Sequence, residues 1–102
     1  MKLVWTNPAL DDLSDIGYFI AQDSPTRAHS FVSELFDQAE RLEDFPLSGR
    51  KFPGTRREDL RELIYEGYRI VYQALPTQII IIAVAEGHKL LRLVEIRARQ
   101  GK

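Results

Sequence analysis

Residues 60–85 read LRELIYEGYRIVYQALPTQIIIIAVA, and this stretch predicts three consecutive strands joined by two short turns. Glu66-Gly67 marks the first turn, because glycine adopts the positive φ that tight hairpins need. Leu75-Pro76-Thr77-Gln78 marks the second turn, where proline has a fixed φ and no amide hydrogen to donate. Residues 79–85 are apolar and mostly β-branched, which is typical of an interior strand covered on both faces.

Two amphipathic helices are expected before this sheet. Asn7-Pro8 and Ser24-Pro25 each place a capping side chain before a proline suited to the first helical turn. The first helix should end near Gln22-Asp23 and the second before Phe45-Pro46. Because the connection between them is short, they should form an antiparallel hairpin whose shared apolar side lies on the sheet. Apolar spacings of three and four mark the two faces: Leu10, Leu13, Ile16 and Ile20, then Ala28, Phe31, Val32, Leu35, Ala39 and Leu42.

The chain length of 102 residues fits a single domain, residues 1–102, with one core. Residues 2–5 favour a first strand, because valine and tryptophan are common in sheets. The predicted fold class is therefore α+β: an N-terminal strand, then an antiparallel two-helix hairpin packed on a mostly antiparallel β-sheet. For the segment after Lys89, periodicity does not decide between helix and strand.

The composition indicates in which compartment the protein works and which partners it lacks. The chain has no cysteine, so it has no disulfide framework or thiolate site, in agreement with a reducing cytoplasm. No apolar segment typical of a signal peptide precedes Asn7-Pro8, and residues 79–85 are far shorter than the roughly 20 apolar residues of a spanning helix. We expect a soluble cytoplasmic protein with no membrane partner.

Charge is distributed unevenly although the net charge is only −1. Residues 1–45 carry three basic and nine acidic side chains, whereas residues 46–102 carry eleven basic and six acidic ones. Residues 46–59 form the one long loop that the sequence predicts, and it contains Arg50, Lys51, Arg56 and Arg57. Basic surface binds anionic partners, but solvated faces and a tail would give the same asymmetry.

Several kinds of chemistry lack the residues they need. Metal binding is poorly supported, because His29 and His88 are isolated from each other and no cysteine completes a site. The chain has no glycine-rich phosphate loop, and its serines have no histidine and carboxylate at a recognisable spacing. We therefore expect no metal and no cofactor, and neither a conventional hydrolase nor a nucleotide enzyme.

Arg69 is the charged residue that demands an explanation, because it lies in the middle of the predicted strand YRIVY. A charged side chain there must reach solvent or find an anionic partner. One interpretation is an ion pair with Glu62, Glu66 or Glu95. The other is an arginine placed to hold a phosphate or a carboxylate of a partner.

Taken in order along the chain, these features resemble the RelE/ParE superfamily of toxins from type II toxin–antitoxin modules, and the ParE branch most. The resemblance covers nearly the whole chain. The segments that carry it are an opening strand leading into PALDDL at residues 8–13, FPLSGR at residues 45–50, LREL at residues 60–63, GYRIVY at residues 67–72, and a base soon after Gly87.

The resemblance implies different activities in the two branches. ParE-like toxins poison DNA gyrase without a known catalytic site and are neutralised by a cognate antitoxin, ParD-like or another small protein, in a hetero-oligomer. RelE-like toxins cleave mRNA on the ribosome without a metal, using basic residues to stabilise the transition state. A third alternative is a degenerate toxin that only binds its antitoxin. We expect the antitoxin on the apolar groove beside the helix hairpin and along a sheet edge.

Site residues follow from the same resemblance. In the ribonuclease branch an arginine stands at the position of Arg69, and another basic residue follows the last strand, roughly at Lys89. That branch also has a catalytic Tyr or His near the carboxyl end, whereas no tyrosine follows Tyr72 in this chain. ParE chains often have His-Gly where this chain has Glu86-Gly87. A nuclease would therefore draw on Arg69, Lys89, Glu86 and His88, with Glu86, His88 or a loop lysine as the base. Target- or anion-binding residues would be Arg69, Lys89, Arg92, Arg97, Arg99, Arg50 and Lys51.

Overall fold

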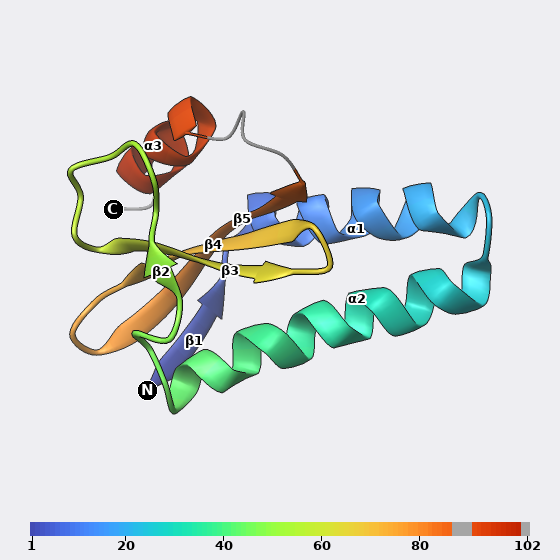
Figure 1. The fold of residues 1–102 in the computed structure, drawn as a ribbon, viewed down its shortest axis with the longest axis horizontal. Helices are drawn as coiled ribbons and strands as arrows, with labels where there is room; N and C mark the ends of the chain where they lie inside the picture. The colour runs from blue at the N-terminus through green and yellow to red at the C-terminus, as the bar shows by residue number, and fades with distance from the viewer. Residues whose placement is uncertain (87–90, 101–102) are drawn as a thin grey trace.

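The computed structural model describes residues 1–86 and 91–100, and a five-stranded sheet forms its centre (Figure 1). The strand order is β1-β5-β4-β3-β2. β1 runs parallel to β5, whereas the other neighbours are antiparallel. The three strands predicted for residues 60–85 are confirmed. The bounds are Lys2–Trp5 for β1, Arg50–Lys51 for β2, Leu60–Tyr65 for β3, Tyr68–Ala74 for β4 and Gln78–Glu86 for β5.

Both predicted turns join the strands as expected. Glu66 has φ 51° and Gly67 has φ 82°, so both turn residues lie in the left-handed region that two-residue hairpins use. Glycine accepts this conformation freely, whereas Glu66 accepts it at some cost because it carries a Cβ. In the second turn the Leu75 N–H donates to the Gln78 carbonyl at 2.9 Å.

Helices α1, Asn7–Ala21, and α2, Pro25–Glu40, form the predicted hairpin, and a 3-10 turn at Arg41–Glu43 follows α2. Figure 1 shows the two helices side by side. Ser24 caps α2 as predicted, since its hydroxyl accepts the Arg27 N–H at 3.1 Å. The predicted cap of α1 was wrong by one residue. Thr6 caps that helix, because its hydroxyl accepts the Ala9 N–H at 3.2 Å and also donates to the Ile81 carbonyl.

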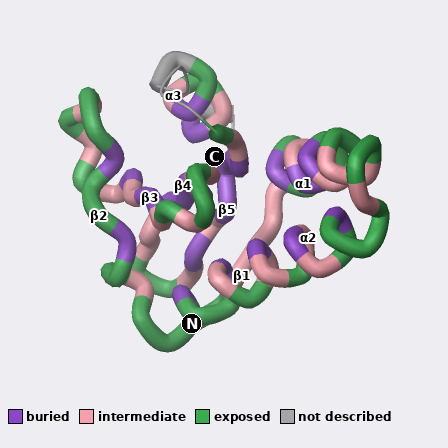
Figure 2. Tube along the Cα trace, turned by 45° about the vertical axis from the view of Figure 1, so that its right-hand side comes forward, coloured by how far each residue is buried: buried purple, intermediate pink, exposed green. Residues whose placement is uncertain are grey.

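Two apolar clusters lie on opposite faces of the sheet. One joins α1 and α2 to β4 and β5, and the other lies between the sheet and helix α3, Leu91–Gln100. Figure 2 shows the buried positions concentrated along the strands and on the sides of the helices that face them. The interior position predicted for residues 79–85 is confirmed, because β5 lies between β1 and β4 and contributes to both clusters.

The segment after Lys89 is a helix where the structure describes it. Val94 and Ala98, four residues apart, are both fully buried in the second cluster. Leu93, by contrast, is 41% exposed. Spacing alone did not select the helix, because the same residues also alternate as a strand would. The selecting factor is the tertiary surface, an apolar sheet face that accepts one side of a helix.

Two further sequence expectations need correction. Leu10 was placed with the core face of α1, but it is 39% exposed, and the buried residue at this turn is its neighbour Ala9. Residues 46–59 were expected to form one loop, but they include β2, whose two residues pair with Glu62 and Arg61. Such a short strand pairs too few residues to leave an alternating pattern in the sequence.

Gly49, just before β2, lies where the loop comes closest to the sheet. Its N–H donates to the Tyr72 hydroxyl at 3.0 Å, and that hydroxyl donates to the Pro46 carbonyl at 2.9 Å. A Cβ at this position would lie 2.6 Å from the Tyr72 oxygen and 2.7 Å from the backbone oxygen of Glu62. Neither contact is tolerable, so the backbone at this position requires glycine.

We predict that Gly49→Ala destabilises the fold by about 1–3 kcal/mol, the usual effect of overpacking, because the added methyl group must displace Tyr72 or β3. Urea unfolding measures this loss. Ser48→Ala is the matched control, because it changes an exposed neighbour and should alter stability by at most about 0.5 kcal/mol. Equal stability of the two variants would contradict the close approach described for this loop.

Candidate functional site

The candidate site begins with a buried carboxylate, Glu62 on β3, whose side chain has no exposed surface. Side chains alternate between the faces of a strand, so Glu62 points to the same face as Leu60, toward the α3 side of the sheet. A carboxylate in such a place must be paired and hydrogen-bonded, because burial of an unpaired charge is strongly unfavourable. Its surroundings are therefore expected to supply cations.

Two arginines meet this requirement. Arg50 of β2 contacts Glu62 Oε2 through Nη2 at 2.6 Å and through Nε at 2.7 Å. Arg69 of β4 contacts Glu62 Oε1 through Nη1 at 3.2 Å. The side chain of Arg69 is only 12% exposed, whereas that of Arg50 is 56% exposed. Of the two interpretations given for Arg69, the structure shows the ion pair, with Glu62 as the carboxylate.

This pairing limits what Arg69 does chemically. To hold a phosphate with its paired nitrogen, Arg69 would have to give up Glu62, and Glu62 would then lose one of the two arginines that pair with it in the described residues. Removing one partner from a buried pair is strongly unfavourable. Arg50 differs, because more than half of its side chain faces solvent. The arrangement thus fixes β2 and β4 to β3 and presents one partly exposed guanidinium.

Two other positively charged candidates, Lys51 and Arg97, also have carboxylate partners. Lys51 contacts Glu58 at 2.5 Å, with both side chains mostly exposed, and Lys51 holds the pKa of Glu58 below its usual value. Arg97 of α3 contacts Asp12 of α1 at 2.8 Å and donates to the Ile82 carbonyl at 3.1 Å. Exposed pairs are weak and compete poorly with a multivalent anion, so Lys51 is more available than Arg97.

A further acidic group lies on the α3 side of the sheet. Asp59 accepts hydrogen bonds from Arg57 at 2.6 Å and from Gln73 at 2.8 Å. The bond from Arg57 is the main cause that lowers the pKa of Asp59 below its ordinary value, although partial burial opposes the shift. Among the described residues, the arginines Arg50, Arg57 and Arg69 on this side of the sheet are therefore each paired with a carboxylate.

Glu86 and Arg69 lie on opposite faces of the sheet. Glu86 pairs with Tyr68 across the β4–β5 ladder, one position beyond the pair of Arg69 with Ala85. Neighbouring pairs point to opposite faces, so the Glu86 carboxylate lies on the helix side and Arg69 on the α3 side. His88 and Lys89 lie outside the described residues, as do the side chains of Arg92 and Arg99.

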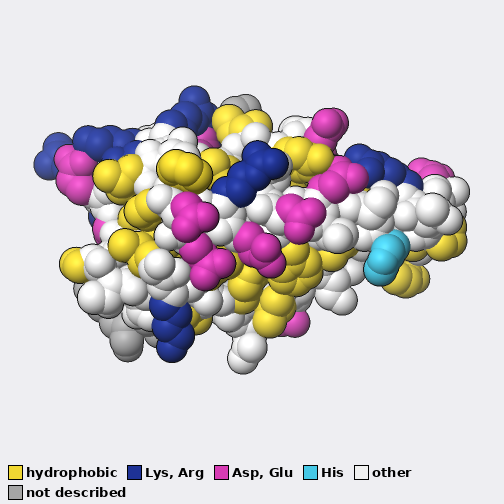
Figure 3. All heavy atoms as spheres, turned by 90° about the horizontal axis from the view of Figure 1, so that it is seen from below, with side chains coloured by type: hydrophobic (Ala, Val, Ile, Leu, Met, Phe, Trp, Pro, Cys, Tyr) yellow, Lys and Arg dark blue, Asp and Glu magenta, His cyan; other side chains and the backbone are white. Residues whose placement is uncertain are grey.

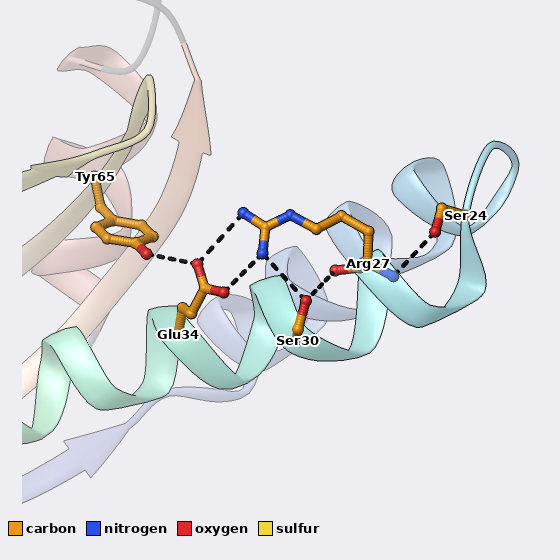
Figure 4. A network of polar contacts seen from close by, with 5 residues as sticks. All are labelled: Ser24, Arg27, Ser30, Glu34 and Tyr65. Carbon is orange, nitrogen blue, oxygen red and sulfur yellow. Dashed lines mark hydrogen bonds and ion pairs between the residues drawn. The ribbon is translucent and has the colours of Figure 1, made fainter.

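On the helix side, a polar network fastens α2 to the end of β3 (Figure 4). The Tyr65 hydroxyl donates to Glu34 Oε1 at 2.5 Å, and Arg27 contacts Glu34 Oε2 at 2.7 Å. The hydrogen bond from Arg27 is the main cause that lowers the pKa of Glu34, and the bond to Glu34 is the main cause that raises the pKa of Tyr65. Phe31 packs between the rings of Tyr65 and Tyr68 and lies beneath Arg27.

An apolar hollow of about 540 Å³ lies between the two helices of the hairpin. Within it the helices approach closely at Gly17, where a Cβ would lie 3.3 Å from Val32. Tyr18 on its rim is 74% exposed. Figure 3, which views the molecule from the side of α2 and β1, shows hydrophobic side chains beside a group of acidic ones on this face. The hollow is lined among others by Leu10, Leu13, Ala28, His29, Val32 and Phe36.

Sequence reasoning missed the roles of Glu62 and Asp12. Glu62 entered only as one of three possible partners of Arg69, although a glutamate two residues from Leu60 in a strand signals an inward-facing charge. Asp12 has the local features of an ordinary acidic residue in the first turns of a helix, where it favours the positive end of the helix dipole. Its carboxylate accepts the Val84 N–H at 3.0 Å and also binds Arg97, contacts that join distant segments and leave no local pattern.

The described part of the chain contains neither a cluster suited to a metal ion nor a helix that could span a membrane. Residues 1–86 and 91–100 contain no cluster of three or more His, Cys, Asp or Glu side chains suited to a metal ion. Over the same ranges, the helices are too short or too polar to cross a membrane.

We predict that Glu62→Gln destabilises the fold by about 3–5 kcal/mol, the range for breaking a buried pair, because Arg69 keeps its charge and loses a carboxylate. Urea unfolding measures the difference from the unmodified chain. Glu58→Gln is the matched control, since it removes a carboxylate that is 77% exposed and should leave the unfolding midpoint almost unchanged. A Glu62→Gln variant as stable as the control would show that this cluster contributes little.

Known proteins are similar to this chain in sequence and in fold. The family of ParE toxins of the type II toxin–antitoxin system parDE matches residues 3–91. Toxin RelE2 of Caulobacter vibrioides is 34% identical over 96 residues, which cover 94% of this chain and 92% of that protein. The matching family and this relative thus carry names from different branches of the superfamily.

Solved structures agree on the α+β architecture. The chromosomal ParDE system from P. aeruginosa has a TM-score of 0.72 at 22% identity, covering 86% of this chain and 97% of that chain. The toxin–antitoxin complex RelBE2 from Mycobacterium tuberculosis has a TM-score of 0.61 at 22% identity, covering 84% of this chain and 96% of that chain. The predicted fold class and the predicted superfamily are both confirmed. The chain belongs to the ParE toxin family of type II toxin–antitoxin systems, within the RelE/ParE superfamily.

Proposed function

We propose that this toxin acts by binding DNA gyrase and blocking replication, without a catalytic site of its own, and that a cognate antitoxin neutralises it in the cytoplasm. The gyrase target is what the resemblance to the ParE branch implies, and the match of the ParE family over residues 3–91 supports that branch. The observation that carries the non-catalytic part is the engagement of Arg69 with the buried carboxylate of Glu62.

Cleavage of mRNA makes demands that the described residues do not readily meet. A ribonuclease of this superfamily needs positive charge on the scissile phosphate and a base for the 2′-hydroxyl proton. Arg69 is 12% exposed and paired, and Glu86 lies on the other face of the sheet. A binding toxin needs neither group to be free. The geometry therefore favours binding over cleavage.

The second candidate is a ribosome-dependent mRNA endonuclease of the RelE kind. Its specific support is the relative named toxin RelE2, which is 34% identical. In this alternative Arg69 and Lys89 hold the phosphate, and His88 or a loop lysine is the base. Loss of a phosphate-holding arginine should then reduce cleavage by about 10²–10³-fold.

An antitoxin partner is part of both candidates. Two structural neighbours are described as toxin–antitoxin systems, ParDE and RelBE2. The hollow between α1 and α2 offers an apolar docking surface of the kind that accepts an amphipathic helix. Tyr18 and Leu10 on its rim are exposed in the isolated chain. An antitoxin bound there would cover these side chains, and a chain that only binds its antitoxin remains the third alternative.

The test adds the purified chain to gyrase in supercoiling and cleavage assays, and separately to an in vitro translation reaction with a defined mRNA. We predict gyrase-linked DNA breaks, lost supercoiling and intact mRNA, all reversed when the chain is first mixed with its antitoxin. Cut mRNA with unaffected gyrase would overturn the proposal in favour of the RelE alternative. If neither substrate is affected, the chain acts only as an antitoxin-binding module.

A further inference from the structure

Strand β5 is longer than its neighbour β1, and this leaves part of its edge without a strand partner. β1 pairs with residues 78–81 of β5 and ends at Trp5, and Thr6 then turns the chain into α1. Beyond Ile81, β5 continues to Glu86, and among the described strands only β4 pairs with it there. Unpaired strand edges expose backbone groups that readily accept another strand.

Side chains satisfy the first part of this edge. The ladder with β4 shifts at Ile82, which has no partner between the pairs of Val71 and Tyr72, and Arg97 donates to its carbonyl at 3.1 Å. Next along the edge, the Val84 N–H donates to Asp12 at 3.0 Å. The chain thus protects its own edge as far as Val84.

The protection stops there in the described structure. The N–H and C=O of one strand residue point to the same side, and residues two apart point alike, so the Val84 carbonyl and the Glu86 N–H face the same edge as the Val84 N–H. Within residues 1–86 and 91–100, no hydrogen bond reaches either group from that side. One residue of an incoming strand would satisfy both.

A hollow of about 320 Å³ lies beside this edge, between one flank of α1 and the ends of β4 and β5. Its rim carries the exposed carboxylates of Asp15 and Glu86, for which the described residues provide no ion pair. Its walls include the rings of Phe19, which is 68% exposed, and of Tyr68. Burial and then the nearby charge of Glu86 raise the pKa of Tyr68, which places the carboxylate close to this ring.

We propose that this notch binds an extended, basic segment of a partner polypeptide, which pairs with β5 at Val84 and Glu86 and directs a lysine or arginine toward Asp15 and Glu86. Strand addition supplies main-chain hydrogen bonds, and alternate side chains enter adjacent pockets. The two carboxylates select positive charge, and Phe19 offers a ring face for the cation. The chain itself provides a precedent, because Arg97 already binds Asp12 along the same edge. The proposal does not depend on which target the toxin attacks.

The test uses ¹⁵N-labelled full-length chain and a nine-residue synthetic peptide that alternates lysine and valine. We expect amide shifts that centre on residues 84–86 and on the flank of α1 that faces them. A peptide with glutamate in place of lysine should not bind. A lysine peptide methylated on alternate backbone nitrogens should also fail, because it keeps the charge and loses the donors for strand pairing.

Variants locate the charge contribution. Asp15→Asn and Glu86→Gln should each weaken the lysine peptide about two- to fivefold, the span expected for one exposed ion pair. Both side chains are exposed, so the fold should survive. Asp23→Asn is the matched control, an exposed carboxylate beyond the end of α1 that does not line the notch, and it should change nothing. Shifts elsewhere, binding of the methylated or acidic peptide, or equal effects of all three variants would overturn the proposal.

Discussion

A single buried carboxylate organises the basic half of this toxin. Glu62 is fully enclosed within the sheet, and a charge in that position is stable only with cations beside it. Arg50 and Arg69 provide them from the strands on either side, so β2, β3 and β4 are joined through one group. The same contact assigns Arg69 a structural role. A sheet built in this way fixes its central arginine and leaves the more exposed Arg50 nearer to any partner.

In the helical half, a second carboxylate joins several elements at the other end of the sheet. Asp12 of α1 contacts a β5 backbone N–H and Arg97 of α3, so one carboxylate links elements from both faces. Tyr65 and Arg27 meet at Glu34 and fasten the hairpin to the end of β3. These contacts are polar and lie at the periphery, whereas the apolar clusters fill the two interfaces. Packing therefore supplies the bulk of the burial, and the carboxylates orient the elements relative to one another.

Local patterns predicted the elements well and the site only partly. The glycine turn at Gly67 and the cap at Ser24 leave signals within a few residues, and both appear as predicted. The choice of helix for α3 depends on the sheet face that it covers, which other segments of the chain build. The pairing of Arg97 with Asp12 joins residues more than 80 positions apart, which no window along the chain contains. Arg69 illustrates the limit. Its strand could be predicted, but its carboxylate partner had to be read from the sheet register.

The measurement that tests the structural role of Arg69 most directly is growth arrest by a chain in which both charges of the pair are removed, Glu62→Leu with Arg69→Met. Replacing a buried pair by apolar groups of similar size is often nearly neutral for stability. Unfolding curves and co-purification with the antitoxin verify the fold. The account predicts that this variant still arrests cells that lack antitoxin. Loss of arrest in a folded, antitoxin-binding variant would contradict it and make Arg69 part of an active site.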